Sequence, residues 1–167
     1  MAWRVPPGDN LPRWVCDACG EIHYQNPRLV VGTVPEHEGR ILLCRRAIEP
    51  RYGYWTLPAG FMENGETAGE AALRETMEEA GARIELGEPC AMVSIPYANQ
   101  VHLFFRARLL HLDFRPGEET LEVGLYDEAA IPWKDMAFRT VAIALQRWWQ
   151  DRRDNVQRFY CGDLKSR

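Results

Sequence analysis

The stretch Gly60–Ala82 reads GFMENGETAGEAALRETMEEAGA and holds six glutamates together with the signals that begin and end a helix. Thr67 and Glu70 have the spacing of a capping box, in which each residue's side chain satisfies a backbone N–H of the other. Gly81 suits the left-handed conformation that ends many helices. The sequence therefore predicts a helix from about Thr67 to Ala80.

One face of this helix is acidic, because Glu75, Glu78 and Glu79 fall close together at about 100° per residue. The apolar residues that cluster on the other side are predicted to face the core: Leu73, Met77 and Ala80. Like charges at this spacing repel each other, and a divalent cation would reverse the sign of the interaction. Carboxylate oxygens favour Mg²⁺, with Mn²⁺ also possible.

A solvated acidic surface is the alternative interpretation of these glutamates. Two features favour metal binding: Arg74 lies inside the acidic run, and Pro58–Gly60 forms a predicted tight loop just before it.

These residues resemble the signature of the Nudix hydrolases. Gly60, Glu66, the pairs Arg74–Glu75 and Glu78–Glu79, and Gly81 all match that signature in register. Thr76 and Ala82 stand where larger aliphatic residues are usual.

The resemblance implies Mg²⁺-dependent hydrolysis of a nucleoside diphosphate linked to another moiety. Its implied metal ligands are Glu75, Glu78, Glu79 and the carbonyl of Gly60. Arg74 would orient a glutamate, and Glu66 would support the site from near the start of the helix. In relatives the general base is often a glutamate from a later loop, which makes Glu119 and Glu122 the candidates here, with Glu79 the alternative.

Two further phrases, residues 22–27 (IHYQNP) and 55–60 (WTLPAG), resemble the subgroup that hydrolyses FAD and ADP-ribose. Pro96, fifteen positions after Gly81, matches a spacing seen in ADP-ribose hydrolases. The NADH-specific group carries a phrase rich in Pro and Trp that residues 88–100 lack. ADP-ribose or FAD is therefore favoured, with NADH or another nucleotide as the alternative.

The remaining pattern predicts an α/β fold with a central mixed sheet between helices, the α/β/α sandwich that the resemblance also implies. Strand-like runs occur at residues 29–34, 41–44, 55–58, 83–95, 100–112 and 121–126. Helical spacing of apolar residues returns from about Phe138. Residues 28–167 are expected to form the hydrolase domain, and residues 1–27 a loop-rich lead.

The lead contains Cys16 and Cys19, a C-x-x-C pair that is half of a zinc knuckle. Some family members carry a preceding pair that would complete the ribbon, and only His23 lies within reach in this chain. Zinc at the pair is therefore not expected.

Substrate contacts are expected from arginines and aromatic residues. Planar guanidinium groups suit phosphate oxygens, and aromatic rings suit a flat base. The candidates are Arg46, Arg51, Trp55 and Tyr97, with Arg45 beside them.

The composition, 167 residues with a formal net charge of −4, fits one globular domain. No stretch has the length of a membrane span or the plan of a signal peptide, and the odd number of cysteines favours reduced thiols. We expect a cytoplasmic protein with a nucleotide substrate and no nucleic-acid or membrane partner, and a homodimer is one open alternative for its assembly. Two rivals stay open: a binding module without catalysis, and an isomerase with Cys44 or Cys90 at its centre.

Overall fold

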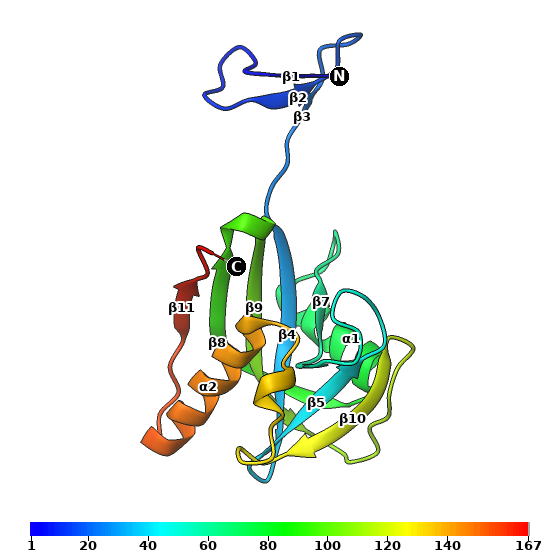
Figure 1. The fold of residues 1–167 in the computed structure, drawn as a ribbon, viewed down its shortest axis with the longest axis vertical. Coiled ribbons are helices and arrows are strands. Elements are labelled where there is room, and N and C mark those ends of the chain that lie inside the picture. Colours follow the sequence, from blue (N-terminus) through cyan, green and yellow to red (C-terminus); the bar gives the residue numbers. More distant parts are fainter. Residues whose placement is uncertain (167) are drawn as a thin grey trace.

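The computed structural model describes residues 1–166, which form a small N-terminal sheet and a larger α/β body (Figure 1). The body contains an eight-stranded sheet and two long helices. Its elements, in chain order, are β4 (Arg28–His37), β5 (Arg40–Arg46), β6 (Trp55–Thr56), β7 (Ala59–Phe61), α1 (Ala68–Ala80), β8 (Ile84–Ile95), the short helix η1 (Pro96–Ala98), β9 (Gln100–Leu109), β10 (Thr120–Tyr126), the short helix η2 (Trp133–Asp135), α2 (Arg139–Asp154) and β11 (Tyr160–Asp163).

The strand order is β10-β5-β4-β9-β8-β11, with β6 paired to β5 and β7 paired to β4. The sheet is mixed, because β4–β9 and β8–β11 are parallel and the other pairs are antiparallel. The predicted fold class, with a central mixed sheet, is confirmed.

The two long helices cover opposite faces of this sheet. Alternate residues of a strand point to opposite faces, and β5 divides in this way. Ile41 and Leu43 belong to the core cluster that contains α2, whereas Leu42 belongs to the cluster that contains the end of α1. Burial on both faces explains why β5 is a continuous apolar run rather than an alternating one.

The predicted tight loop at Pro58–Gly60 was wrong, because Ala59–Phe61 form strand β7. Val31 of β4 pairs with Gly60, and Gly32 pairs with Ala59. A Cβ atom on Gly32 would collide with Ala59 and with the carbonyl oxygen of Pro58, so the close approach of the two strands requires glycine there. Pairing with a distant strand supplied the hydrogen bonds that local sequence did not indicate.

The lead is more regular than predicted. Residues 1–27 include an antiparallel sheet in the order β1-β2-β3, with β1 at Ala2–Arg4, β2 at Arg13–Val15 and β3 at Ile22–His23. Figure 1 shows this sheet standing apart from the body and joined to the start of β4. Among residues 1–166 there is no helix long and apolar enough to cross a membrane.

Candidate functional site

Helix α1 begins and ends where the sequence predicted. The hydroxyl of Thr67 accepts a hydrogen bond from the Glu70 backbone N–H at 3.2 Å, and the Glu70 carboxylate accepts one from the Thr67 N–H at 2.8 Å. Gly81 closes the helix in the left-handed conformation, with φ of 57°. A side-chain cap of this kind contributes about 1 kcal/mol to the stability of the helix that carries the glutamates.

The predicted core face of α1 was right for Ala80, which is buried, but wrong for Leu73 and Met77. Leu73 is 40% exposed and Met77 is 45% exposed. The buried residues of the helix are Ala71, Ala72, Thr76, Glu79 and Ala80. Small side chains allow α1 to lie close to the sheet, and the acidic face therefore overlaps the buried face instead of opposing it.

Thr76 shows how closely the helix is held. It is fully buried, and its hydroxyl lies 2.7 Å from the hydroxyl of Thr33 on β4. A larger aliphatic residue at this position would leave Thr33 without that partner. Thr76 departs from the family signature, and its partner Thr33 lies 43 positions away, so no local pattern indicates the contact.

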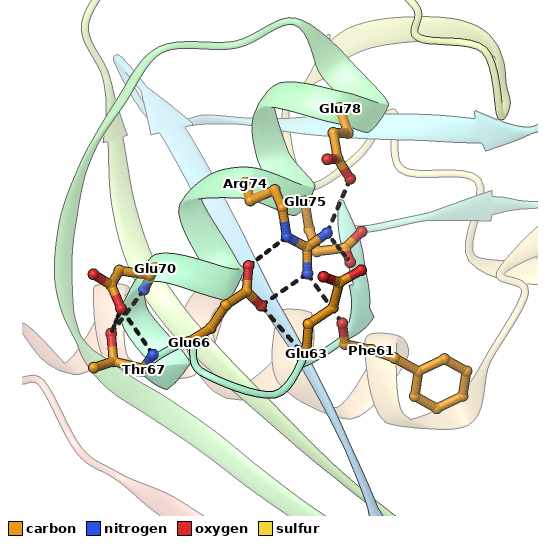
Figure 2. A network of polar contacts seen from close by, with 8 residues as sticks. All are labelled: Phe61, Glu63, Glu66, Thr67, Glu70, Arg74, Glu75 and Glu78. Carbon is orange, nitrogen blue, oxygen red and sulfur yellow. Dashed lines mark hydrogen bonds and ion pairs between the residues drawn. The ribbon is translucent and has the colours of Figure 1, made fainter.

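Arg74 is the centre of the acidic face (Figure 2). Its Nε donates to Glu66 at 2.6 Å, and one Nη atom donates to Glu75 at 2.7 Å and to Glu78 at 2.9 Å. The other Nη donates to the carbonyl oxygen of Phe61 at 3.1 Å. One guanidinium thus gathers three carboxylates from the loop and the helix.

The hydrogen bonds from Arg74 lower the pKa of Glu66 to about 2, with the Glu63 backbone N–H helping. Glu66, in the loop just before α1, is therefore charged at neutral pH and anchors the Arg74 guanidinium. This placement agrees with a supporting role rather than a role in proton transfer.

Glu75 lies against the backbone of β7. A Cβ atom on Gly60 would collide with the Glu75 carboxylate, so glycine is needed for this approach. Burial raises the pKa of Glu75, and Glu78 and Glu119 raise it further, while Arg74 opposes them.

Glu79 is the most deeply placed carboxylate of the face, with 8% of the residue exposed. Its oxygen accepts a hydrogen bond from the Ala59 N–H at 2.9 Å. Burial raises the pKa of Glu79 to about 7; the Ala59 N–H and Arg46 oppose this rise, while Glu75 and Glu119 add to it. A carboxylate buried at this cost among others of the same charge is suited to a positive ligand.

The donor set fits a hard divalent cation, because it consists of carboxylates beside the backbone of β7 at Gly60. In the described chain, however, no three acidic, cysteine or histidine side chains converge on a single point. Glu75 and Glu78 turn toward Arg74, and Glu79 turns toward Ala59. A cation would compete with Arg74 for the first two carboxylates.

The structure separates the two glutamates considered as general base. Glu119 follows Gly117, whose backbone N–H donates to the Glu79 carbonyl oxygen at 3.1 Å, so this segment lies against the end of α1. The charge of Glu119 raises the pKa of both Glu75 and Glu79. Glu122 lies opposite Arg45 on the neighbouring strand and forms an ion pair with it at 3.7 Å.

The expected substrate contacts are spread over several elements. Arg46 is buried, stacks on Phe138 at 5.2 Å and lies close enough to lower the pKa of Glu79. Trp55 packs edge-on against Tyr126 at 5.1 Å, next to the α2 core. The other two candidates lie in turns: Arg51 stacks on Tyr54, and Tyr97 lies in η1, between β8 and β9.

Neither cysteine considered for an isomerase is a reactive thiol. Cys44 is buried, and burial together with the charge of Glu79 raises its pKa well above the ordinary value. Burial raises the pKa of Cys90 to about 12, and its thiol donates to the Phe104 carbonyl on the α2 side. Both thiols remain protonated at neutral pH.

The pair Cys16 and Cys19 forms a turn that ends at Gly20, whose N–H donates to the Cys16 carbonyl at 2.9 Å. The backbone N–H groups of Cys19 and Ala18 lower the pKa of the Cys16 thiol. This is a favourable environment for a thiolate, and it supplies two of the four ligands that structural zinc requires.

Comparison with known proteins identifies two regions. The model of the NUDIX domain family matches residues 26–157, and the model described as Nudix N-terminal, a zinc ribbon, matches residues 1–25. The chain is 34% identical over 119 residues to the NAD-capped RNA hydrolase NudC of Chromobacterium violaceum. That match covers 70% of this chain and 44% of the relative, so the chain spans less than half the length of that protein.

The ADP-ribose pyrophosphatase of Methanocaldococcus jannaschii is 27% identical over 129 residues, which cover 75% of this chain and 76% of the relative. A crystal structure of a NUDIX hydrolase from Nitrosomonas europaea shares 51% identity, with a TM-score of 0.95 over 99% of this chain and 94% of the other. These matches agree with the acidic face built around Arg74, and the chain belongs to the Nudix hydrolase family.

Proposed function

We propose that this protein hydrolyses the diphosphate of a nucleoside diphosphate linked to another moiety, with Mg²⁺ as cofactor and ADP-ribose or FAD as the favoured substrate. The observation that carries the proposal is the graded acidic face of α1. Glu79 is buried, the side chain of Glu75 is 12% exposed, and the side chain of Glu78 is 57% exposed. The exposure of the carboxylates thus increases from Glu79 to Glu78, and a diphosphate can approach the acidic face from its exposed side.

Glu75, Glu78, Glu79 and the carbonyl oxygen of Gly60 are the groups that would hold the cation. When bound, Mg²⁺ neutralises diphosphate oxygens and lowers the pKa of the attacking water. The chain itself supplies the remaining tasks. Arg74, anchored by Glu66, fixes the direction of Glu75 and Glu78, and Arg46 offers a guanidinium to the phosphate oxygens near Glu79.

The proton of the attacking water needs an acceptor near the acidic face. Glu119 is the stronger candidate, because it lies beside Glu75 and Glu79, whereas Glu122 is paired with Arg45. Glu79, with a pKa of about 7 in the metal-free protein, is the alternative within the helix. Hydrolysis adds the hydroxide to one phosphorus and leaves the other phosphate as the departing group.

The choice of substrate rests on resemblance. The relative from Methanocaldococcus jannaschii is an ADP-ribose pyrophosphatase, and the relative NudC is an NAD-capped RNA hydrolase. The substrates named for both relatives contain an adenine nucleotide joined to a second group through a diphosphate. The NudC match also supports a nicotinamide dinucleotide, free or at the end of an RNA, as a second candidate.

The two rival functions receive less support. The acidic face is complete, with every glutamate of the signature in place, which argues against a binding module without catalysis. The isomerase would need a reactive cysteine, and Cys44 and Cys90 are buried and protonated.

The test is hydrolysis of a substrate panel with and without Mg²⁺: ADP-ribose, FAD, NADH, NAD-capped RNA and nucleoside triphosphates, with products identified by mass. We expect Mg²⁺-dependent release of AMP from ADP-ribose or FAD. If none of the diphosphate-bridged substrates is cleaved, the proposed function is wrong.

A further inference from the structure

The loop between β5 and β6, residues 47–54, is tied to β5 by hydrogen bonds. The Gly53 N–H donates to the Arg46 carbonyl, and the Arg46 N–H donates to the Tyr54 carbonyl, both at 2.9 Å. The side chains of Arg45 and Arg46 donate to the carbonyl oxygens of Gly53 and Pro50, again at 2.9 Å. Two arginine side chains of β5 therefore hold this loop in one position.

The loop borders the acidic face at both of its ends. At its start, the Ala47 N–H donates to the carbonyl oxygen of Glu119 at 2.8 Å, and the N–H of Gly117, two residues before Glu119, donates to the Glu79 carbonyl oxygen at 3.1 Å. A few residues beyond its end, the Ala59 N–H donates to Glu79. Both ends of the loop therefore lie near backbone segments that contact Glu79.

Between these ends, the loop carries an exposed aromatic ring and a guanidinium. Tyr52 is 54% exposed. Arg51 adopts a φ of 70°, a conformation that costs free energy for a residue with a side chain, and its guanidinium lies 5.4 Å from the centre of the Tyr54 ring. Strained residues of this kind persist where the surrounding structure holds them, often at ligand-binding sites.

We propose that Tyr52 is a specificity-determining residue whose ring stacks on the flat base of the nucleotide substrate, while Tyr54 holds Arg51 beside it. This inference rests on the proposed function and assigns a contact within the same site. We prefer Tyr52 to the neighbouring rings because each of those already contacts another side chain. The Tyr54 ring contacts the Arg51 guanidinium, and Trp55 packs on Tyr126. A fixed loop loses little conformational freedom when a base binds, which favours affinity.

A single exposed tyrosine can also have no role, since isolated apolar side chains are normal on protein surfaces. Ligands with and without a base separate the two cases. AMP is the product of the proposed reaction, and ribose 5-phosphate shares its sugar and phosphate but lacks the ring. Stacking predicts that Tyr52 contributes to binding of the first ligand only.

The experiment compares the wild type with Tyr52→Ala, Tyr52→Phe and Tyr24→Ala by calorimetric titration of AMP and of ribose 5-phosphate in Mg²⁺. Tyr24 is the matched control, a 60% exposed tyrosine next to the N-terminal sheet that contacts Arg13. We expect Tyr52→Ala to weaken AMP binding by about 5-fold or more, the effect of losing one stacked base. The phenylalanine variant and the Tyr24 control should stay within about twofold of the wild type.

Kinetics supply a second readout: Tyr52→Ala should raise the KM for ADP-ribose or FAD with little change in kcat, as for lost uniform binding. Unchanged AMP affinity, or an equal loss of affinity for ribose 5-phosphate, would overturn the assignment of Tyr52. If the wild type cleaves a panel substrate and Tyr52→Ala is unaffected, only this inference fails. If the wild type neither cleaves a substrate nor binds AMP, the proposed function fails with it.

Discussion

Replacing Glu79 by glutamine should make the metal-free protein more stable while abolishing most of its activity. Burial raises the pKa of Glu79 from its ordinary 4.5 to about 7. A carboxyl group whose pKa is higher in the folded state contributes stability below pH 4.5 and loses it as the pH rises through 7. At about 1.4 kcal/mol per pKa unit, the charged side chain costs roughly 3 kcal/mol at pH 8.

Glutamine removes this charge and keeps an oxygen that can accept from the Ala59 N–H. In urea unfolding with EDTA at pH 8, we expect Glu79→Gln to exceed the wild type by about 1–3 kcal/mol, because relaxation reduces the full penalty. At pH 4.5 the difference should be small. Saturating Mg²⁺ should stabilise the wild type more than the variant, since a ligand bound by the folded state alone adds to its stability.

Glu78→Gln is the matched control, because its side chain is 57% exposed and bonds to Arg74. It should also lose most activity, but its metal-free stability should change by only about 0.5 kcal/mol, as for an exposed ion pair. The reasoning fails if Glu79→Gln is no more stable than the wild type at pH 8 in EDTA. Near wild-type turnover of either variant at saturating Mg²⁺ would remove that residue from the metal face.

Three further outcomes are expected. Thr76→Val should lower the free energy of unfolding by about 1–3 kcal/mol, because it leaves the Thr33 hydroxyl buried and unpaired. The double variant Thr33→Val/Thr76→Val should lose less than the sum of the two single variants. Additive losses in urea unfolding would mean that the two hydroxyls do not interact. Burial lowers the pKa of His102 to about 4, so the contribution of this histidine to stability is complete above pH 6.5 and is lost as the pH falls through 4. The loss is roughly 3 kcal/mol, and His102→Gln should not show it. Parallel curves of stability against pH for the two proteins would contradict this. Glu119→Gln should lower kcat by at least about 100-fold and Glu122→Gln by less than about threefold, with the reverse order assigning the general base to Glu122.

The sequence by itself determined the local features of this protein. The ends of α1 follow from Thr67, Glu70 and Gly81, because helix caps are hydrogen bonds and backbone conformations set by residues a few positions apart. The hairpin of β4 and β5 follows in the same way from two apolar runs around a turn at Glu38–Gly39. The fixed spacing of the signature likewise placed Arg74, Glu75, Glu78 and Glu79 on one helix.

Only the tertiary structure decided which face of α1 is buried. Apolarity favoured Leu73 and Met77, but the helix instead packs through alanines and Thr76, because small side chains allow a closer approach to β4. That choice carries Glu79 inward and raises its pKa. The position of Glu119 beside the acidic face also depends on pairing between distant strands, and such contacts are fixed by the packing of the whole sheet rather than by neighbouring residues.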